Sequence, residues 1–217
     1  MKAVLFDLDG TLVDSNEAHA DVWAQVFAEA GVDVSRDAIR GQIGKGGDLL
    51  VPTLAPGLDE AAQEKLAERH GEIFKADHLA AVRPFPDAAA LVAHVHARGL
   101  KVVLASSASR DELDHYVGLL GIAGLVDAST TADDVETSKP APDIFGVALD
   151  KLAGVDPADA VVVGDTPYDV EAAAKAGMRA VAVRSGGFDD AALSGAVAIH
   201  DDVADLLARF DDSVLAG

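Results

Sequence analysis

The alternation of short apolar runs with amphipathic helical segments is the feature that most restricts the fold of this chain. Each of four such runs ends in a polar residue or a glycine-containing turn, and the runs occupy residues 3–6, 102–105, 160–163 and 180–183. Helical segments lie between or beside them, each followed by a glycine, over residues 86–98, 109–120, 142–153 and 167–176. A weaker run at Leu125 and Val126 predicts a fifth strand. This pattern predicts an α/β protein with a Rossmann-like, doubly wound parallel sheet.

The segment 15–81 interrupts this alternation, because it shows helical periodicity only. Ser35 can cap one of its helices and Asp59 precedes another, while three glycines surround a single lysine in the loop 43–48. We therefore predict an α-helical cap subdomain, residues 15–81, inserted into a core domain made of residues 1–14 and 82–217.

The composition limits the chemistry and the partners. The chain has 217 residues, no cysteine and a formal net charge of −20. It therefore has no disulfide, thiol catalysis or thiolate metal site, and carboxylate oxygens, which suit a hard cation, are the obvious metal ligands. The charge repels nucleic acid and anionic membranes, and no apolar run reaches the ~18 residues of a membrane span. No signal-peptide pattern opens the chain, so we expect a cytoplasmic protein. We also expect a monomer or weak homodimer without nucleic-acid or membrane partners.

Chemically useful side chains follow three of the predicted strands. Asp7 and Asp9 come directly after the first run, Ser106 follows the second, and Asp165 follows the third after one glycine. Ligands of open parallel sheets bind beyond the carboxyl ends of the strands, so these side chains should converge at one edge. Asp7 and Asp9 are two residues apart and point to the same side of an extended chain. The sequence thus predicts a site rich in carboxylates.

Four motifs in order resemble those of the haloacid dehalogenase-like superfamily. They are Asp7-Leu8-Asp9-Gly10-Thr11, Ser106, Lys139 within Ser138-Lys139-Pro140-Ala141-Pro142, and Gly164-Asp165-Thr166-Pro167-Tyr168-Asp169. The resemblance spans nearly the whole chain, and the helical insertion after the first motif resembles the cap of the subfamily that includes phosphoglycolate phosphatases, sugar phosphatases and β-phosphoglucomutase. The resemblance implies an enzyme that moves a phosphoryl group of a small phosphorylated metabolite.

Within this resemblance, three motif residues take roles that phosphoryl chemistry supports. Asp7 is the expected nucleophile, since carboxylates form aspartyl-phosphates and divide one difficult step into two. Asp9 could protonate the leaving oxygen and then activate water. Lys139 would meet the Asp7 carboxylate and the phosphate as a point charge.

A divalent cation removes the repulsion between neighbouring carboxylates and polarises the phosphate, and Mg²⁺ is the expected ion. We predict that it binds an Asp7 oxygen, the main-chain carbonyl of Asp9, and Asp165. Asp169 could lie beside the metal or pair with Lys139.

Further residues are candidates for binding the substrate. Ser106 could donate to a phosphate oxygen through its hydroxyl and Ser107 through its backbone N–H, although Ser107 or Ser109 could instead cap the helix that follows. Thr11, at the end of the first motif, is assigned to the substrate as well.

The predicted cap adds two candidates, Lys45 in the glycine-rich loop and His19 one helical turn before Trp23. Each could contact the substrate. Each could equally be an ordinary solvated residue.

The resemblance leaves a choice of activities. Dehalogenases and phosphonatases of the superfamily lack the second aspartate, so Asp9 favours phosphatases and mutases. Sugar mutases tend to have Gly-Val and Glu-Asp where this chain has Gly10-Thr11 and Gly164-Asp165, and the segment 44–48 lacks an arginine for a second phosphate. We therefore predict an Mg²⁺-dependent phosphatase that hydrolyses a phosphosugar or phosphoglycolate type of metabolite through an aspartyl-phosphate. The alternatives are a β-phosphoglucomutase-like sugar phosphomutase and a non-catalytic phosphometabolite-binding protein.

Overall fold

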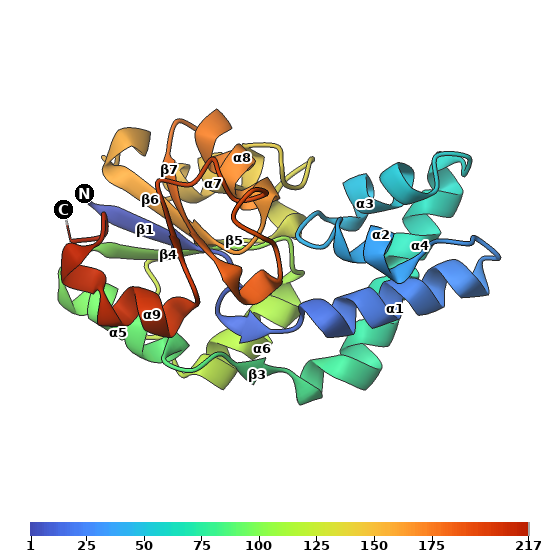
Figure 1. The fold of residues 1–217 in the computed structure, drawn as a ribbon, viewed down its shortest axis with the longest axis horizontal. Helices are drawn as coiled ribbons and strands as arrows, with labels where there is room; N and C mark the ends of the chain where they lie inside the picture. The colour runs from blue at the N-terminus through green and yellow to red at the C-terminus, as the bar shows by residue number, and fades with distance from the viewer. Residues whose placement is uncertain (217) are drawn as a thin grey trace.

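The core of the molecule is a six-stranded sheet in which every pair of neighbouring strands is parallel (Figure 1). The computed structural model describes residues 1–216. The sheet has the order β5-β4-β1-β6-β7-β8 and consists of β1 (Ala3–Phe6), β4 (Lys101–Ala105), β5 (Ala128–Thr130), β6 (Ala160–Gly164), β7 (Arg179–Val183) and β8 (Ala198–His200). All four residues of β1 are fully buried, as a strand inside a parallel sheet requires. The predicted α/β fold is confirmed.

Helices cover both faces of the sheet (Figure 1). One face packs against α5 (Ala88–Ala97), α6 (Arg110–Leu120) and α9 (Val203–Ala208), and the other against α7 (Asp143–Asp150) and α8 (Pro167–Lys175). Successive strand residues point to opposite faces, so Val4 and Phe6 join the first hydrophobic cluster while Ala3 and Leu5 join the second. The sheet is thereby buried on both sides, and only its strand ends are free to present polar groups.

The segment between residues 15 and 81 is helical and lies at the end of the molecule opposite the two termini (Figure 1). It contains α1 (Asn16–Glu29), α2 (Arg36–Arg40), α3 (Gly47–Leu54), α4 (Glu60–Ile73), the π-helical turn η1 (Phe74–His78) and the 3₁₀ turn η2 (Leu79–Ala81). Ser35 and Asp59 cap α2 and α4 by accepting from backbone N–H groups. The chain leaves and re-enters the core through a small antiparallel pair, β2 (Val13–Asp14) and β3 (Arg83–Pro84). We call residues 15–81 the helical insertion.

Some elements differ from the sequence-based expectation. The fifth strand does not lie at Leu125 and Val126, where it was expected. The N–H of Leu125 donates to the Ile122 carbonyl in a turn, and hydrogen bonding to β4 begins at Asp127, whose N–H donates to the Val102 carbonyl. The strand β8 and the helix α3 were not expected, since one has three residues and the other begins in the glycine-rich loop. Short 3₁₀ turns complete the fold, namely η3 (Ala132–Asp134), η4 (Pro157–Asp159), η5 (Arg184–Gly186) and η6 (Phe210–Asp212).

Across the described residues, none of the helices combines the length and the apolar character needed to cross a membrane.

Candidate active site

The carboxyl ends of the central strands bring the predicted motif residues together. Asp7 follows β1, Ser106 follows β4 and Asp165 follows β6, while Lys139 comes from the loop before α7. Pairing with the neighbouring strands continues to these positions, because the N–H of Asp7 donates to Val163 and that of Ser106 to Thr130. The backbones of Asp7 and Ser106 are thereby fixed by the sheet.

Lys139 bridges two carboxylates in the interior. Its ammonium lies 2.6 Å from Asp7 Oδ1 and 2.7 Å from Asp169 Oδ1, and all three side chains are almost fully buried. Burial alone would lower the pKa of Lys139, but the charges of Asp169 and Asp7 outweigh it and hold that pKa above its ordinary value. Lys139 therefore stays cationic. The predicted pairing of Asp169 with Lys139 is present, and a place for Asp169 beside a metal ion stays a prediction.

Asp7 is a carboxylate whose ionised form is disfavoured in this protein without a metal. Burial raises its pKa to about 7, opposed by Lys139 and reinforced by the charges of Asp169 and Asp9. A further positive charge near Asp7 would restore its ionised form.

Asp165 is fully buried and held by two donors. Thr11 Oγ1 and Asn16 Nδ2 each donate to one of its carboxylate oxygens at 2.9 Å. Burial and the charges of Asp169 and Asp7 raise its pKa well above the ordinary value. Asp7, Asp165 and Asp169 each offer an oxygen, and these three atoms lie within 4.8 Å of one another. Such a cluster of hard oxygen ligands could hold a divalent cation.

Asp9 is oriented by side chains from the start of α1 and from α6. Its Oδ1 accepts hydrogen bonds from Ser15 Oγ at 2.6 Å and Tyr116 OH at 3.0 Å, and lies 3.3 Å from His19 Nε2. Its Oδ2 lies 3.5 Å from Ser106 Oγ. Burial pushes the pKa of Asp9 up, but the contacts with His19, Ser15 and Tyr116 outweigh burial and keep this pKa below its ordinary value.

The serines after β4 have distinct environments. Ser106 Oγ accepts from the N–H of Ala108 at 3.1 Å, whereas Ser107 Oγ is buried with no hydrogen-bond partner among the described residues. Ser109 N and Oγ both lie 2.7 Å from a carboxylate oxygen of Glu112 and donate to it, which makes Ser109 the cap of α6. Since Ser109 supplies the cap, neither Ser106 nor Ser107 is needed to cap α6.

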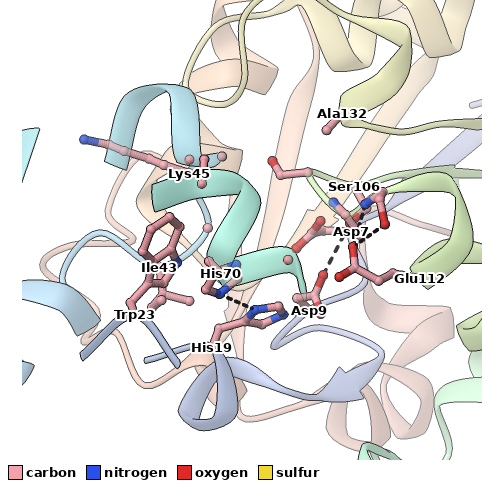
Figure 2. Close-up of a pocket in the computed structure, with 18 of the residues that line it drawn as sticks. Asp7, Asp9, His19, Trp23, Ile43, Lys45, His70, Ser106, Glu112 and Ala132 are labelled. Atoms are coloured by element: carbon pink, nitrogen blue, oxygen red, sulfur yellow. Dashed lines mark hydrogen bonds and ion pairs between the residues drawn. The ribbon is translucent and has the colours of Figure 1, made fainter. Parts of the chain in front are cut away.

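A cavity of about 220 Å³ lies between these strand ends and the helical insertion (Figure 2). Asp7, Asp9 and the two serines line it from the core, and Trp23, Ile43 and His70 line it from the insertion.

An aromatic group of residues from the insertion connects the cavity wall to Asp9. The His19 ring lies between Asp9 and His70, with its Nδ1 3.3 Å from His70 Nε2. His70 stacks on Trp23 at 4.2 Å and His19 on Phe74 at 3.8 Å between ring centroids. Burial and the neighbouring His19 hold the pKa of His70 well below its ordinary value, so this ring is neutral.

The glycine-rich loop lies directly against the core. The N–H of Gly46 donates to Ser138 Oγ at 2.9 Å, next to Lys139 in sequence. A Cβ on Gly46 would come within 2.7 Å of the Ser138 side chain, and one on Gly44 within 2.6 Å of Thr166. Only glycine permits this approach, so these positions serve contact between the insertion and the core.

Lys45 borders the cavity, but its ammonium is directed elsewhere. In Figure 2 its side chain points away from Asp7 and Asp9. The Nζ atom donates to Gln42 Oε1 at 2.6 Å and lies 4.7 Å from the ring centroid of Tyr168. Burial lowers the pKa of Lys45. Its assignment to the substrate stays a prediction.

Four residues of the site were not found by sequence reasoning: Ser15, Asn16, His70 and Tyr116. Ser15 and Asn16 directly follow the first motif, and that position could have drawn attention to them. Tyr116 lies on the buried face of α6 and looks like a core aromatic residue in the sequence. The sequence around His70 contains no pattern that would distinguish it from an exposed histidine on a helix.

The parallel fold, with carboxylates, a buried lysine and serines at its strand ends, defines a hydrolase of a known class. The family model described as "haloacid dehalogenase-like hydrolase" matches residues 1–177, and the chain belongs to this family.

Similar proteins agree with this assignment. The chain is 34% identical over 217 residues to a phosphoglycolate phosphatase of Rhodospirillum rubrum, with 94% of this chain and 89% of that protein covered. It is 35% identical over 192 residues to the chloroplastic protein SUPPRESSOR OF QUENCHING 1 of Arabidopsis thaliana, which covers 85% of this chain but only 18% of that protein. Among solved structures, a hydrolase from Pseudomonas syringae superposes with a TM-score of 0.90 at 28% identity, covering 98% of this chain and 99% of that one.

Proposed function

We propose that this protein is a Mg²⁺-dependent phosphatase that hydrolyses a small phosphorylated metabolite through a phosphorylated Asp7. One observation carries this proposal: Asp7 and Asp9, two carboxylates with different partners, lie together in one cavity. Asp7 is paired with the buried ammonium of Lys139, Asp9 accepts from Tyr116, and the insertion covers the cavity. A phosphoryl transfer needs such a nucleophile, charge neutralisation and a proton donor together. The phosphoglycolate phosphatase among its relatives supports the same class of reaction.

The donor set fits Mg²⁺. It contains only oxygen ligands, and burial together with neighbouring negative charges raises the pKa values of Asp7 and Asp165, so a cation bound there would favour their ionised forms. Asp7 and Asp165 would hold the ion together with the main-chain carbonyl of Asp9, and Asp169 would stay beside it on Lys139. A bound Mg²⁺ neutralises carboxylate charge and polarises the phosphate.

The two proposed steps use only residues of this chain and water. An Asp7 oxygen forms a bond to phosphorus while the bond from phosphorus to the leaving oxygen breaks, and Asp9 gives its proton to that oxygen. Water then attacks the phosphorus, Asp9 takes a proton from the water, and the bond to Asp7 breaks to release phosphate. Asp9 ends the cycle protonated again. Although its pKa is low in the free site, the negative phosphate of a bound substrate raises it by repulsion.

The substrate phosphate would be held by Lys139, Ser106 and the otherwise unpartnered hydroxyl of Ser107. A cavity of about 220 Å³ under the helical insertion, which we propose to be a cap, suits a small leaving group such as a glycolate or a sugar. His19 would act at Asp9, and Thr11 at Asp165, where their contacts lie.

The test is a screen of the purified protein with Mg²⁺ against phosphorylated metabolites, repeated with Asp7→Asn. We expect phosphate release by the wild type and none by the variant, while the exposed control Asp150→Asn keeps full activity. A crystal structure with a metal fluoride should show the phosphoryl mimic on Asp7. Phosphatase activity near wild type in Asp7→Asn would overturn the nucleophile. Interconversion of sugar monophosphates faster than phosphate release would indicate a mutase, and binding without turnover a non-catalytic protein.

A further inference from the structure

Tyr116 is a core residue with one polar atom directed at the candidate site. It is fully buried on α6, where its ring belongs to the same hydrophobic cluster as Leu113 and Leu120. An apolar residue of similar size would fill that space. Its hydroxyl, however, donates to Asp9 Oδ1 at 3.0 Å. A buried hydroxyl without a partner is costly, so Tyr116 and Asp9 fit each other as a pair.

The donors to Asp9 fall into two groups. Ser15 and His19 belong to the helical insertion, whereas Tyr116 belongs to the core, as Asp9 itself does. All three contact Oδ1. Within the described residues, the other oxygen, Oδ2, has a single contact, the long one of 3.5 Å with Ser106 given above. Three donors stabilise negative charge on Oδ1, so the proton of Asp9 is directed to Oδ2.

We propose that Tyr116 is a positioning residue for proton transfer: its hydroxyl holds Oδ1 of Asp9 so that Oδ2 exchanges the proton with the leaving oxygen and with water. This inference rests on the proposed function, because it takes Asp9 as the acid and base. Tyr116 does not touch the reacting atoms and acts only through Asp9. Because Tyr116 and Asp9 are both core residues, their bond does not depend on the contacts of the insertion.

Two further properties suit Tyr116 to this role. Its phenol carries a proton that it can donate, and the Asp9 carboxylate oxygen 3.0 Å away can only accept it. Its ring is fixed by packing in the core, which leaves the hydroxyl little freedom to move.

The experiment compares two esters that differ in their need for a proton. The leaving group of p-nitrophenyl phosphate, p-nitrophenolate, is weakly basic and departs without being protonated. The leaving group of phenyl phosphate, phenolate, is more basic, so its departure is accelerated by an acid that protonates it. The quantity kcat/KM reports the steps up to departure of the leaving group. Tyr116→Phe removes only the hydroxyl, and should lower kcat/KM about 10-fold for phenyl phosphate but less than ~2-fold for p-nitrophenyl phosphate, since a positioned acid contributes roughly 10²–10⁴-fold.

The chain offers a matched control, because it has two tyrosines. The hydroxyl of Tyr168 donates to the carbonyl of Gly41 in the insertion, far along the chain from Asp9. Tyr168→Phe should change kcat/KM of both esters by the same factor. Thermal unfolding should show that both variants are folded at the assay temperature, since each keeps its ring.

The background Asp9→Asn separates this inference from the proposed function. If Tyr116 acts through Asp9, Tyr116→Phe has no further effect on kcat/KM in that background. Equal losses on both esters, no loss on either, or a loss that persists in Asp9→Asn would each overturn the role of Tyr116. If Asp9→Asn itself hydrolyses phenyl phosphate as well as the wild type does, the acid of the proposed function is wrong, and the inference with it.

Discussion

The Lys139 ammonium lies 2.6 Å from the Asp7 carboxylate, although 132 positions separate the two residues in the chain. Both side chains are buried at the ends of the central strands, and Asp169 supplies a second negative charge to the same ammonium. This arrangement neutralises charge at the point where a phosphate would arrive. It also makes the site expensive to disturb, because removal of the lysine would leave two buried carboxylates without their cation.

Replacing Lys139 by methionine should therefore impair both activity and stability. Lys139→Met keeps much of the volume but leaves two buried carboxylates without a cation, and we expect a loss of about 3–5 kcal/mol in the free energy of unfolding. Phosphatase activity should fall below detection. Denaturant unfolding and phosphate release measure the two effects.

The control for this change is Lys151→Met, which removes an exposed lysine 3.4 Å from Asp134. A surface pair contributes only about 0–1 kcal/mol, so stability and activity should change little. Similar losses in the two variants would contradict the role given to Lys139.

The Mg²⁺ requirement should depend on pH. Burial raises the pKa of Asp7 to about 7 and that of Asp165 in the same direction, so below about pH 7 a proton occupies the position that a cation needs. The Mg²⁺ concentration for half-maximal activity should therefore rise as the pH falls from about 8 to about 5.5. Calorimetric titration of Mg²⁺ into the protein should show the same trend, and weaker pH dependence in Asp7→Asn. An equal requirement at both pH values would contradict the assignment.

The same raised pKa has a consequence for stability. The folded protein binds the Asp7 proton more tightly than the unfolded chain does, so this group contributes stability that is present at low pH and is lost as the pH rises through about 7. Asp7→Asn removes the titration, and its stability without metal should exceed that of the wild type at about pH 8 more than at about pH 5.5.

Much of the site was predictable because its residues are fixed by local sequence. Asp7, Ser106 and Asp165 each follow an apolar run. The carboxyl ends of parallel strands lie at the same edge of the sheet, and this does not depend on how the connecting helices pack. Lys139 was placed by the order of the motifs. Its pairing with Asp7 and Asp169 is present in the structure.

The remainder depends on contacts that no local pattern contains. Tyr116 has the spacing of a core residue, and only the packing of α6 in the core directs its hydroxyl to Asp9. His70 acquires its neutral state from burial under Trp23, which belongs to another helix. The fifth strand shifted from Leu125 to Ala128 because edge pairing with β4, and not hydrophobicity, decides where it begins.

Thr11 provides a test between two roles. It was predicted to bind substrate, but its hydroxyl donates to Asp165 at 2.9 Å. Thr11→Val keeps the shape and removes that donor, so we expect the Mg²⁺ concentration for half-maximal activity to rise about 10-fold, as for other groups that orient a metal ligand. The KM for p-nitrophenyl phosphate at saturating Mg²⁺ should change little. A higher KM with an unchanged Mg²⁺ requirement would instead assign Thr11 to the substrate.

Two glycines offer a final prediction about Asp165. A Cβ on Gly186 would lie 1.8 Å from Asp165 Oδ2, whereas a Cβ on Gly146, within α7, meets nothing within 4 Å. Gly186→Ala must therefore displace the Asp165 carboxylate or the η5 turn, and should abolish Mg²⁺-dependent activity. Gly146→Ala should leave activity intact and raise the free energy of unfolding by about 0.5–1 kcal/mol, because alanine favours the helix. Phosphate release at several Mg²⁺ concentrations and denaturant unfolding measure both effects. Wild-type activity and Mg²⁺ requirement in Gly186→Ala would show that Asp165 is not held where the structure places it.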